Sequence, residues 1–443
     1  MFGLHVLLGL CVYFLLISAF PLDDYPRDLN ASFLASNISN SRVVITDTSA
    51  DDYLTLLSAP FDVANPNPVD KGFAHDDSDG TGTTIFAIDT GFNLEKYPDE
   101  QCLDQRKIET YLVPWSYRGV PLSDAEKKDG YYYPPDNMDD VGVPSDSHEI
   151  HGHGTQVAIL AAGCKTGVAR KANLYLIKMM EVMMKSGRVE EILTGPDAQL
   201  QGLRKVISVV GRSEAPRGKA VLVMCAGNWR EEDMRSQYGA RWETTKAQMK
   251  TALLQLDHLG VTIVMPAGND GVSANPQQDP GFVPRYIDQQ FPQNLATADS
   301  PMLLGEGVNT YDLQLSNRKL KSGTSFSAPI VAGLAAYILG QASNPCPYNP
   351  TSAVEEDSVG MCMKKYLTRT AFQRVDANNL LSKDPSQYKY DIPPSILVVS
   401  NGASVDTEEE EGENPDADPT ACWSDDTRGQ CKMANITGTW FEK

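Results

Sequence analysis

Three short stretches of the sequence carry residue types that together could make a hydroxyl group reactive. Asp89 lies in AIDTG, His153 in HGTQVA, and Ser325 in GTSFSAP. A serine hydroxyl is a poor nucleophile at neutral pH. It becomes effective when an imidazole takes its proton and a carboxylate holds that imidazole in the correct tautomer. We therefore predict nucleophilic catalysis at Ser325, with His153 as the base and Asp89 as the orienting carboxylate.

The histidine stretch also raises the alternative of a metal site. HEIHGHG contains His148, Glu149, His151 and His153, and neutral imidazole is the commonest metal ligand in proteins. The glycines between the histidines prevent the regular helix that would place two of them on one face. No second cluster of His, Cys, Asp or Glu residues completes a set of ligands. We therefore expect no metal cofactor and interpret His148 and His151 as loop residues.

Short apolar runs and helical patterns alternate between about residues 83 and 340. The expected strands are TTIFAI (83–88), NLYLIKM (173–179), AVLVMC (220–225) and VTIVMPA (261–267), and the expected helices span 154–163, 199–210, 244–259 and 325–340. Continuous apolar strands separated by helices are typical of a parallel sheet with both faces covered. We predict an α/β fold of three layers, with a mostly parallel central sheet and helices on both faces. Asp89 and Asn269 follow two of these strands, at the sheet edge where ligands bind.

The order Asp, His, Ser and the three motifs resemble those of the subtilisin-like serine peptidases, over about residues 80 to 342. The resemblance implies the subtilisin-like form of the three-layer fold and a serine endopeptidase that acts on proteins or peptides. It also implies the roles of the three residues. Ser325 would attack the scissile carbonyl and form an acyl-enzyme, while His153, oriented by Asp89, would transfer the proton.

The same resemblance implies an oxyanion hole and a substrate-binding strand. Family members use an asparagine after an Ala-Gly pair, and the sequence offers Asn228 in VMCAGNW and Asn269 in VMPAGND. Order and spacing favour Asn269, together with the backbone N–H of Ser325. Substrate is then expected at Met224, Cys225, Ala226 and Gly227, with Ala267 and Gly268 in the specificity pocket. A further contact is expected at residues 186–188.

The two ends of the chain differ from the region that carries the motifs. An apolar run from Phe2 to Phe20 predicts a secretory signal that ends near Ala19, with a membrane anchor as the alternative. The expected divisions are a signal (1–19), an N-terminal segment or short prosegment (20–79), the peptidase domain (80–342), a C-terminal extension (343–404) and an acidic tail with cysteines (405–443). No membrane span is expected after signal cleavage.

Charge, cysteines and glycosylation sites limit the environment and the partners. A net charge of −20 argues against nucleic acid as a partner, since binding to phosphates needs a basic surface. Three Asn-x-Ser/Thr sites, at Asn30, Asn37 and Asn435, favour a secreted glycoprotein, with the vacuole or another secretory lumen as the alternative location. We expect a monomer. The family commonly binds structural calcium, but the sequence shows no ligand set for it.

The cysteines predict two disulfides and one free thiol. Seven of the eight cysteines remain after signal removal, and an odd number in an exported protein predicts a free thiol. We assign it to Cys225, inside an apolar run, and predict the local pairs Cys346 with Cys362 and Cys422 with Cys431. His75 and His258 are expected at the surface or at a helix end.

Two other functions remain open from the sequence. One is a catalytically silent binding protein on the peptidase fold, and the other is an esterase or amidase that uses the same three residues.

Overall fold

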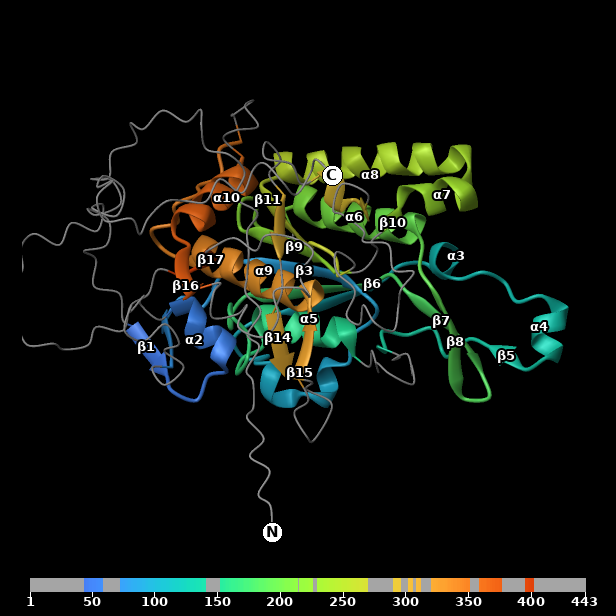
Figure 1. The fold of residues 1–443 in the computed structure, drawn as a ribbon, viewed down its shortest axis with the longest axis horizontal. Coiled ribbons are helices and arrows are strands. Elements are labelled where there is room, and N and C mark those ends of the chain that lie inside the picture. Colours follow the sequence, from blue (N-terminus) through green and yellow to red (C-terminus); the bar gives the residue numbers. More distant parts are fainter. Residues whose placement is uncertain are drawn as a thin grey trace, which may run out of the picture.

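Six strands form the central sheet of the computed structural model, and every neighbouring pair is parallel (Figure 1). Their order across the sheet is β13-β11-β9-β3-β6-β4. In chain order they are β3 (Thr84–Asp89), β4 (Ile108–Leu112), β6 (Asn173–Lys178), β9 (Ala220–Met224), β11 (Val261–Pro266) and β13 (Leu303–Gly305). The four strands predicted from the sequence are the interior ones, whose central residues are mostly apolar because both of their faces are covered.

The structure describes eleven stretches of the chain, and the statements below refer to them. These are residues 44–58, 72–140, 152–213, 215–225, 229–269, 290–295, 302–305, 308–311, 320–350, 358–376 and 395–401.

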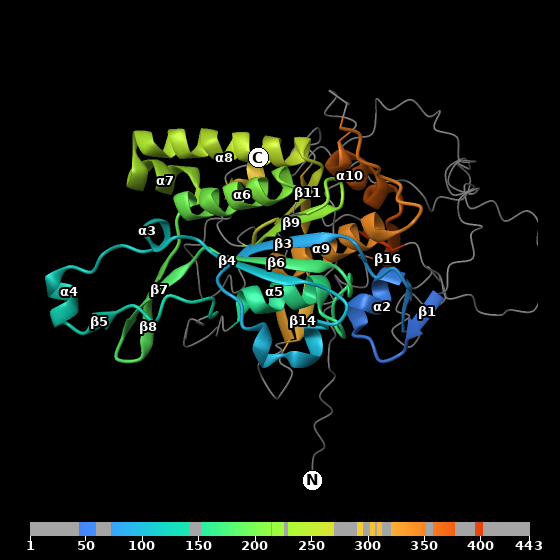
Figure 2. The same cartoon turned by 180° about the vertical axis from the view of Figure 1, so that it is seen from behind.

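Helices cover both faces of the sheet, as predicted. Ile85 and Ala87 of β3 point into one hydrophobic core, whereas Phe86 and Ile88 point into the other, because side chains alternate along a strand. The first core is closed by α5 (His153–Ala162) and α9 (Thr324–Gly340), and the second by α6 (Pro196–Gly211) and α8 (Ala240–His258). Both views show the sheet between these two layers (Figures 1 and 2). The prediction of a three-layer α/β fold is confirmed.

Helix α9 is buried along almost its whole length. Every residue from 326 to 339 is buried, which agrees with a helix that is apolar on all sides rather than along one stripe. It packs against α5 and against the sheet strands β9, β11 and β13. Within the described part of the chain, none of the helices combines the length and the apolar character that a membrane crossing requires.

Segments from both ends of the chain pack against this core. The N-terminal elements are β1 (Val44–Asp47), α2 (Asp52–Ser58) and β2 (Phe73–Asp76), and the C-terminal elements are α10 (Val359–Arg369), β16 (Phe372–Asp376) and β17 (Ser395–Val398). Leu57 and Phe73 belong to the same hydrophobic core as α9. Asn401 joins the two ends, since its backbone N–H donates to Leu57 O (3.0 Å) and its Nδ2 donates to Ala74 O (2.7 Å).

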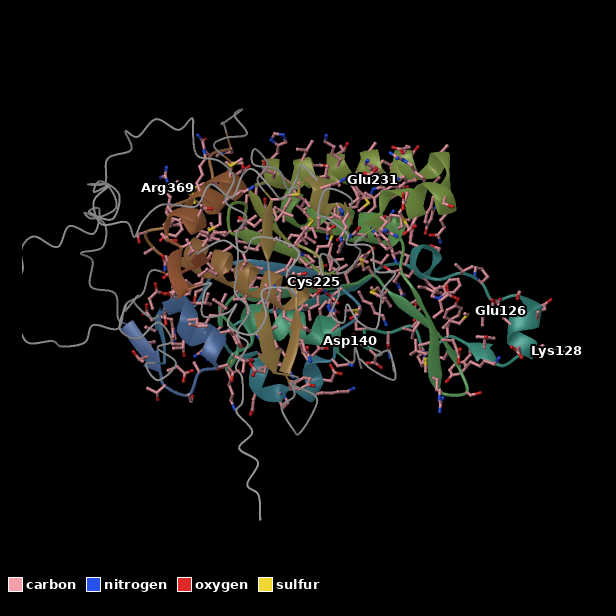
Figure 3. All side chains as sticks on the ribbon, viewed as in Figure 1. Glu126, Lys128, Asp140, Cys225, Glu231 and Arg369 are labelled. Atoms are coloured by element: carbon pink, nitrogen blue, oxygen red, sulfur yellow. A yellow bond between two sulfur atoms is a disulfide. The ribbon has the colours of Figure 1, made fainter. Side chains whose placement is uncertain are left out.

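A projecting arm extends from the body beyond the ends of β4 and β6 (Figure 1). It consists of α3 (Trp115–Arg118), α4 (Asp124–Lys128) and the antiparallel strands β5 (Tyr131–Tyr132), β7 (Glu181–Lys185) and β8 (Arg188–Leu193). Glu126 and Lys128 lie at its outer end (Figure 3). At its base, the buried guanidinium of Arg118 in α3 donates to Glu181 (2.7 Å), the first residue of β7, and to Asp136, so these charge pairs hold the parts of the arm together.

The other described elements are short or lie at the periphery. They are β10 (Trp229–Arg230), α7 (Glu231–Tyr238), β12 (Gln290–Phe291), β14 (Val308–Tyr311), β15 (Leu320–Gly323) and the 3-10 helices η1 (Leu94–Lys96), η2 (Pro98–Glu100) and η4 (Gln293–Leu295).

The cysteine predictions are confirmed where the structure describes them. Cys346 and Cys362 form a disulfide, and Cys225 is free and buried. Cys422 and Cys431 lie outside the described residues. A second disulfide, Cys102–Cys164, joins positions that are 62 apart in the sequence and was not predicted.

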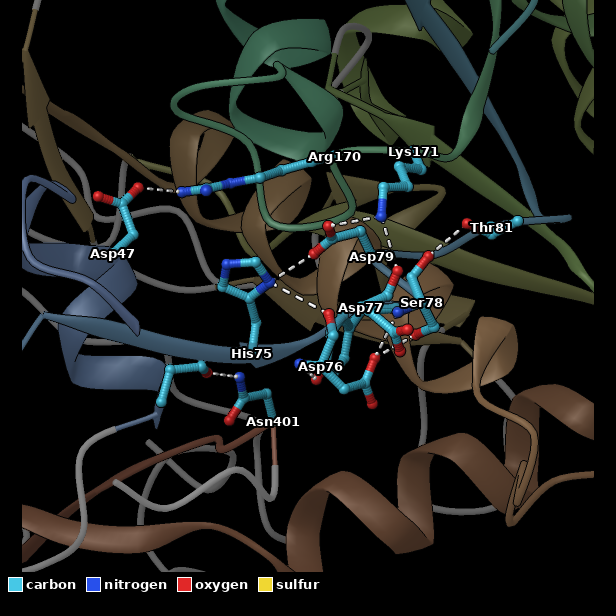
Figure 4. A network of polar contacts seen from close by, with 12 residues as sticks. Asp47, His75, Asp76, Asp77, Ser78, Asp79, Thr81, Arg170, Lys171 and Asn401 are labelled. Atoms are coloured by element: carbon cyan, nitrogen blue, oxygen red, sulfur yellow. Dashed lines mark hydrogen bonds and ion pairs between the residues drawn. The ribbon is translucent and has the colours of Figure 1, made fainter. Parts of the chain in front are cut away.

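The expectation that His75 lies at the surface is wrong. Its side chain is 3 % exposed, stacks on Phe73 with ring centroids 5.0 Å apart, and places Nδ1 2.6 Å from Asp79 Oδ1 (Figure 4). The physical reason is that β2 is covered by other parts of the fold, and Nδ1 of the buried imidazole lies within reach of both the Asp76 carbonyl oxygen (3.2 Å) and the Asp79 carboxylate. His258 is exposed near the end of α8, as expected.

Candidate active site

The carboxyl end of β3 meets the N-terminus of α5. Asp89 is the last residue of β3 and is fully buried, and His153 is the first residue of α5. His153 Nδ1 lies 2.6 Å from Asp89 Oδ1. An ionised carboxylate can only accept a hydrogen bond, so Nδ1 carries the proton in this contact. In the neutral imidazole, Nε2 is then the nitrogen that can take a proton from another group.

Two local features explain why these two residues can approach. The backbone N–H of Thr90 donates to Asp89 Oδ1 at 2.7 Å and fixes the carboxylate. Gly154 follows His153, and a Cβ at this position would collide with Gly91 O and come within 2.9 Å of Asp89 Cβ. The glycine in HGTQVA therefore permits close packing of α5 against the end of β3.

The N-terminal turn of α9 lies beside the imidazole. The ring of Phe326 is 5.9 Å from the ring of His153, measured between centroids. Ser325 directly precedes Phe326 and is the second residue of the helix, where it is half-buried. The first N–H groups of a helix have no acceptor within the helix. The backbone N–H of Ser325 is one of these groups, so it can donate to a bound ligand.

Hydrogen-bond directions fix the amide of Asn269. Asn269 Oδ1 accepts from the backbone N–H of Thr324 (2.8 Å) and from Thr324 Oγ1 (2.9 Å). The hydroxyl of Thr324 donates here, because an amide oxygen can only accept, and the same hydroxyl accepts from the backbone N–H of Gly268 (3.1 Å). With its oxygen held in this way, the exposed Asn269 presents its NH2 group as a donor beside the first turn of α9.

The predicted substrate-binding residues are placed only in part. Met224 ends β9 with its side chain buried, and Cys225 follows it, also buried. Ala267 and Gly268 are half-buried at the end of β11, next to Asn269. The residues outside the description are Ala226, Gly227 and Asn228, as well as His148, Glu149 and His151 of the alternative metal cluster. In the described stretches, no three His, Cys, Asp or Glu side chains lie close enough together to hold a metal ion.

Residues 186–188, the further expected contact with substrate, belong to the β7–β8 hairpin of the projecting arm. They form the turn between β7 and β8 on the projecting arm, where Ser186 and Gly187 have φ of 50° and 77°. This turn therefore belongs to the projecting arm, whereas Asp89 and His153 meet at the end of β3.

The free thiol of Cys225 is buried and is affected by the negative charge of Asp89. Burial, with a further contribution from the negative charge of Asp89, raises the pKa of Cys225 well above its usual value. The thiol therefore stays protonated at neutral pH and is a poor nucleophile.

Asp140 is a buried residue beside the site that was not among the candidates predicted from the sequence. It is 6 % exposed, and it accepts hydrogen bonds from Thr90 and Thr155, the neighbours of Asp89 and Gly154 (Figure 3 labels Asp140). Burial raises the pKa of Asp140, while these hydrogen bonds oppose the rise. The only sequence signal is a pair of aspartates at the end of the loop, and it does not say which of the two is buried.

Comparisons with known proteins match part of the chain to one family of proteins. Residues 80–287 match the model of the subtilase family, Peptidase S8. Subtilisin-like protease 1 of Pseudogymnoascus destructans is 27 % identical over 280 residues, which cover 61 % of this chain and 55 % of that protein. Proteinase R of Parengyodontium album is 24 % identical over 307 residues, which cover 67 % of this chain and 64 % of that protein. The chain thus spans 55 % and 64 % of the length of these two curated relatives.

Among solved structures, that of sphericase matches with a TM-score of 0.36 and 19 % identity, covering 66 % of this chain and 84 % of that one. The resemblance predicted from the motifs is confirmed by the family model. Residues 80–287, which match the model of the subtilase family of subtilisin-like serine peptidases, carry Asp89, His153 and Asn269.

Proposed function

We propose that this chain is a secreted serine endopeptidase in which Asp89, His153 and Ser325 form the catalytic triad. The observation that carries the proposal is the 2.6 Å contact between Asp89 and His153 at the end of β3, beside the first turn of α9. A buried carboxylate, an imidazole that contacts it through Nδ1, and a serine at a helix N-terminus are the groups that acyl transfer requires.

In this mechanism, Ser325 Oγ attacks the carbonyl carbon of the scissile peptide bond while His153 Nε2 takes the hydroxyl proton. Asp89 stabilises the resulting imidazolium through Nδ1. The tetrahedral intermediate then collapses, and His153 gives the proton to the leaving amine. A water molecule, activated by the same imidazole, hydrolyses the acyl-enzyme.

Two donors would stabilise the negative oxygen of the intermediate. One is the NH2 group of Asn269, whose orientation is set by Thr324, and the other is the backbone N–H of Ser325. Both would be aimed before the reaction begins, so little reorganisation is needed when the charge develops. Substrate would lie along residues 224–227, with Ala267 and Gly268 beside its side chain. These small residues favour a broad, apolar preference.

The location and the absence of cofactors are part of the same proposal. The apolar N-terminal run and the three Asn-x-Ser/Thr sites support export, and the two described disulfides fit an oxidising compartment. No step of the mechanism needs a metal ion or an organic cofactor.

A fluorophosphonate probe tests the proposal directly, because it reacts with an activated serine. We expect stoichiometric labelling of the purified full chain at Ser325 and its loss in Ser325→Ala. Ser327→Ala is the matched control, since Ser327 lies on the same helix but is fully buried, and its Oγ has no hydrogen-bond partner in the described residues. This variant should keep full labelling.

Absence of labelling in the unaltered chain would show that the protein is a silent relative rather than a peptidase. Turnover of small esters without cleavage of casein would instead assign it to the esterases or amidases. Activity that zinc chelation abolishes and added zinc restores would bring back the metal alternative.

A further inference from the structure

Asp140 is a buried carboxylate that the proposed mechanism does not use. It lies at the end of the stretch 72–140, and its side chain faces both the turn after β3 and the N-terminus of α5. Its neighbour Asp139 is exposed. Buried carboxylates are rare unless they are paired or hydrogen-bonded, so the contacts of Asp140 need an explanation.

The first contact runs to the residue after Asp89. Thr90 Oγ1 lies 2.6 Å from Asp140 Oδ1. The same hydroxyl oxygen accepts the backbone N–H of Gly154 at 3.1 Å. Because a hydroxyl has a single proton, Thr90 donates that proton to Asp140. Thr90 therefore bridges Asp140 to the residue that follows His153.

The second contact runs to α5. Asp140 Oδ2 accepts from the backbone N–H and from Oγ1 of Thr155, each at 3.0 Å. Thr155 Oγ1 also accepts the backbone N–H of Asn93 at 2.9 Å, so its proton too is directed to Asp140. All three hydrogen bonds are thus accepted by Asp140, and this is the pattern of an ionised carboxylate.

This negative charge lies at the positive end of α5. The residue before the helix is Gly152, which provides no side-chain cap, and Asp140 supplies the missing acceptor. His153 is in the same first turn. The charged groups that face this site are Asp89 and His153, together with Lys178 of β6, whose Nζ donates to Asp139 O at 2.8 Å.

We propose that Asp140 is a positioning residue for the catalytic pair: through Thr90 and Thr155 it holds Asp89 and His153 in register, and its negative charge stabilises the imidazolium that forms during catalysis. The inference rests on the proposed peptidase function. Two of its three contacts reach Thr155, two positions after His153, and the third reaches Thr90, directly after Asp89. A shift of either element would change the separation of the pair.

Kinetics across a pH range test the proposal. Asp140→Asn can still accept from Thr90, but its NH2 group opposes the donors of Thr155, and the charge is lost. We expect kcat to fall by about 10- to 100-fold, with KM changed by less than about twofold, because misplacement of a catalytic group affects the reaction more than binding. Since loss of a nearby negative charge disfavours the imidazolium, the acidic limb of kcat/KM should move to lower pH by roughly half a unit or more.

Asp139→Asn is the matched control, because it removes the same charge one position away on an exposed side chain. It should change kcat by less than about twofold and leave the limb in place, as expected for a screened surface charge. A folded Asp140→Asn protein with unchanged kcat and an unmoved limb would overturn the proposal. A loss of kcat without movement of the limb would also overturn it, since Asp140 would then be only structural.

A second measurement does not depend on activity. The imidazole Cε1–H signal of His153 can be assigned by its absence in His153→Asn and then titrated by NMR. We expect its pKa to be lower in Asp140→Asn than in the unaltered chain, and an equal pKa would contradict the proposal. If the unaltered chain fails to cleave peptides, the proposed function fails, and this titration still decides the role of Asp140.

Substitution of Thr90 gives a test if Asp140→Asn does not fold. Thr90→Val removes the hydroxyl that joins Asp140 to Gly154 but keeps the carboxylate charge. We expect kcat to fall by about tenfold with the acidic limb unmoved, and Thr90→Ser, which keeps the hydroxyl, should restore kcat. Equal activity of the valine and serine variants would overturn the positioning role.

Discussion

Replacement of Asn269 by aspartate tests the role of the amide NH2 group separately from that of the amide oxygen. The structure assigns the oxygen to Thr324, through contacts of 2.8 and 2.9 Å, and leaves the NH2 group as the donor. Asn269→Asp keeps an oxygen for Thr324 and changes the shape of the side chain very little. It replaces the donor by a negatively charged acceptor. The substitution should therefore affect the oxyanion without affecting the fold.

The expected fall in kcat follows from the loss of the amide donor while the oxygen is kept. Loss of one oxyanion-hole donor lowers kcat by about 10²–10³, a range established for an asparagine of a subtilisin, and this corresponds to about 2.7–4 kcal/mol of transition-state stabilisation. The added charge repels the oxyanion, so we expect the upper end of that range. Both hydrogen bonds to Thr324 remain, so the free energy of unfolding should change by less than about 1 kcal/mol.

Single-turnover and steady-state cleavage of a fluorogenic peptide measure the effect, with urea unfolding as the test of stability. KM should stay within about twofold, because the donor acts on the transition state. Asn228→Asp is the comparison, since Asn228 follows the other Ala-Gly pair of the sequence. If Asn228→Asp abolishes turnover and Asn269→Asp does not, the assignment of the oxyanion donor is wrong.

Three further predictions concern buried charges and sulfur. Arg118→Met should lower the free energy of unfolding by about 3–5 kcal/mol, because Glu181, whose side chain is 1 % exposed, loses its partner. The double variant Arg118→Met with Glu181→Met should have a urea midpoint close to that of the unaltered chain. Iodoacetamide at pH 8 should alkylate Cys225 at least ~100-fold more slowly in the native than in the unfolded protein, since burial raises its pKa, and equal rates by mass spectrometry would refute this. Cys362→Ser, which breaks the bond to Cys346 across a sequence separation of 16, should lower the free energy of unfolding by about 3 kcal/mol, and an unchanged melting temperature would contradict the expectation.

The interior of the fold is predictable because its strands are uniformly apolar. VTIVMPA and TTIFAI show this directly, and both become strands that are buried on two faces. The edge strands give no such signal. IETYL of β4 is only partly buried, and β13 is three residues long, so neither differs from a loop in the sequence.

The residues that lie in motifs are predictable for another reason. Asp89 and His153 are bracketed by glycines and small residues that close packing requires, and those constraints are visible locally. His75 and Asp140 lack them, because their burial depends on segments far away in the chain. The Cys102–Cys164 bond has the same character, since no local spacing indicates which two cysteines will meet.

The contact between Asn401 and the N-terminal segment affects when the protein can fold. Asn401 Nδ2 reaches a carbonyl 327 positions earlier in the sequence, at Ala74. The N-terminus emerges from the ribosome first, so Asp89, His153 and Ser325 have all been synthesised before this contact can form. The long separation also makes closure of the contact entropically costly. Completion of the core therefore coincides with the end of translation of the described region, and a chain truncated before residue 395 would contain every residue of the proposed triad in an unfinished fold.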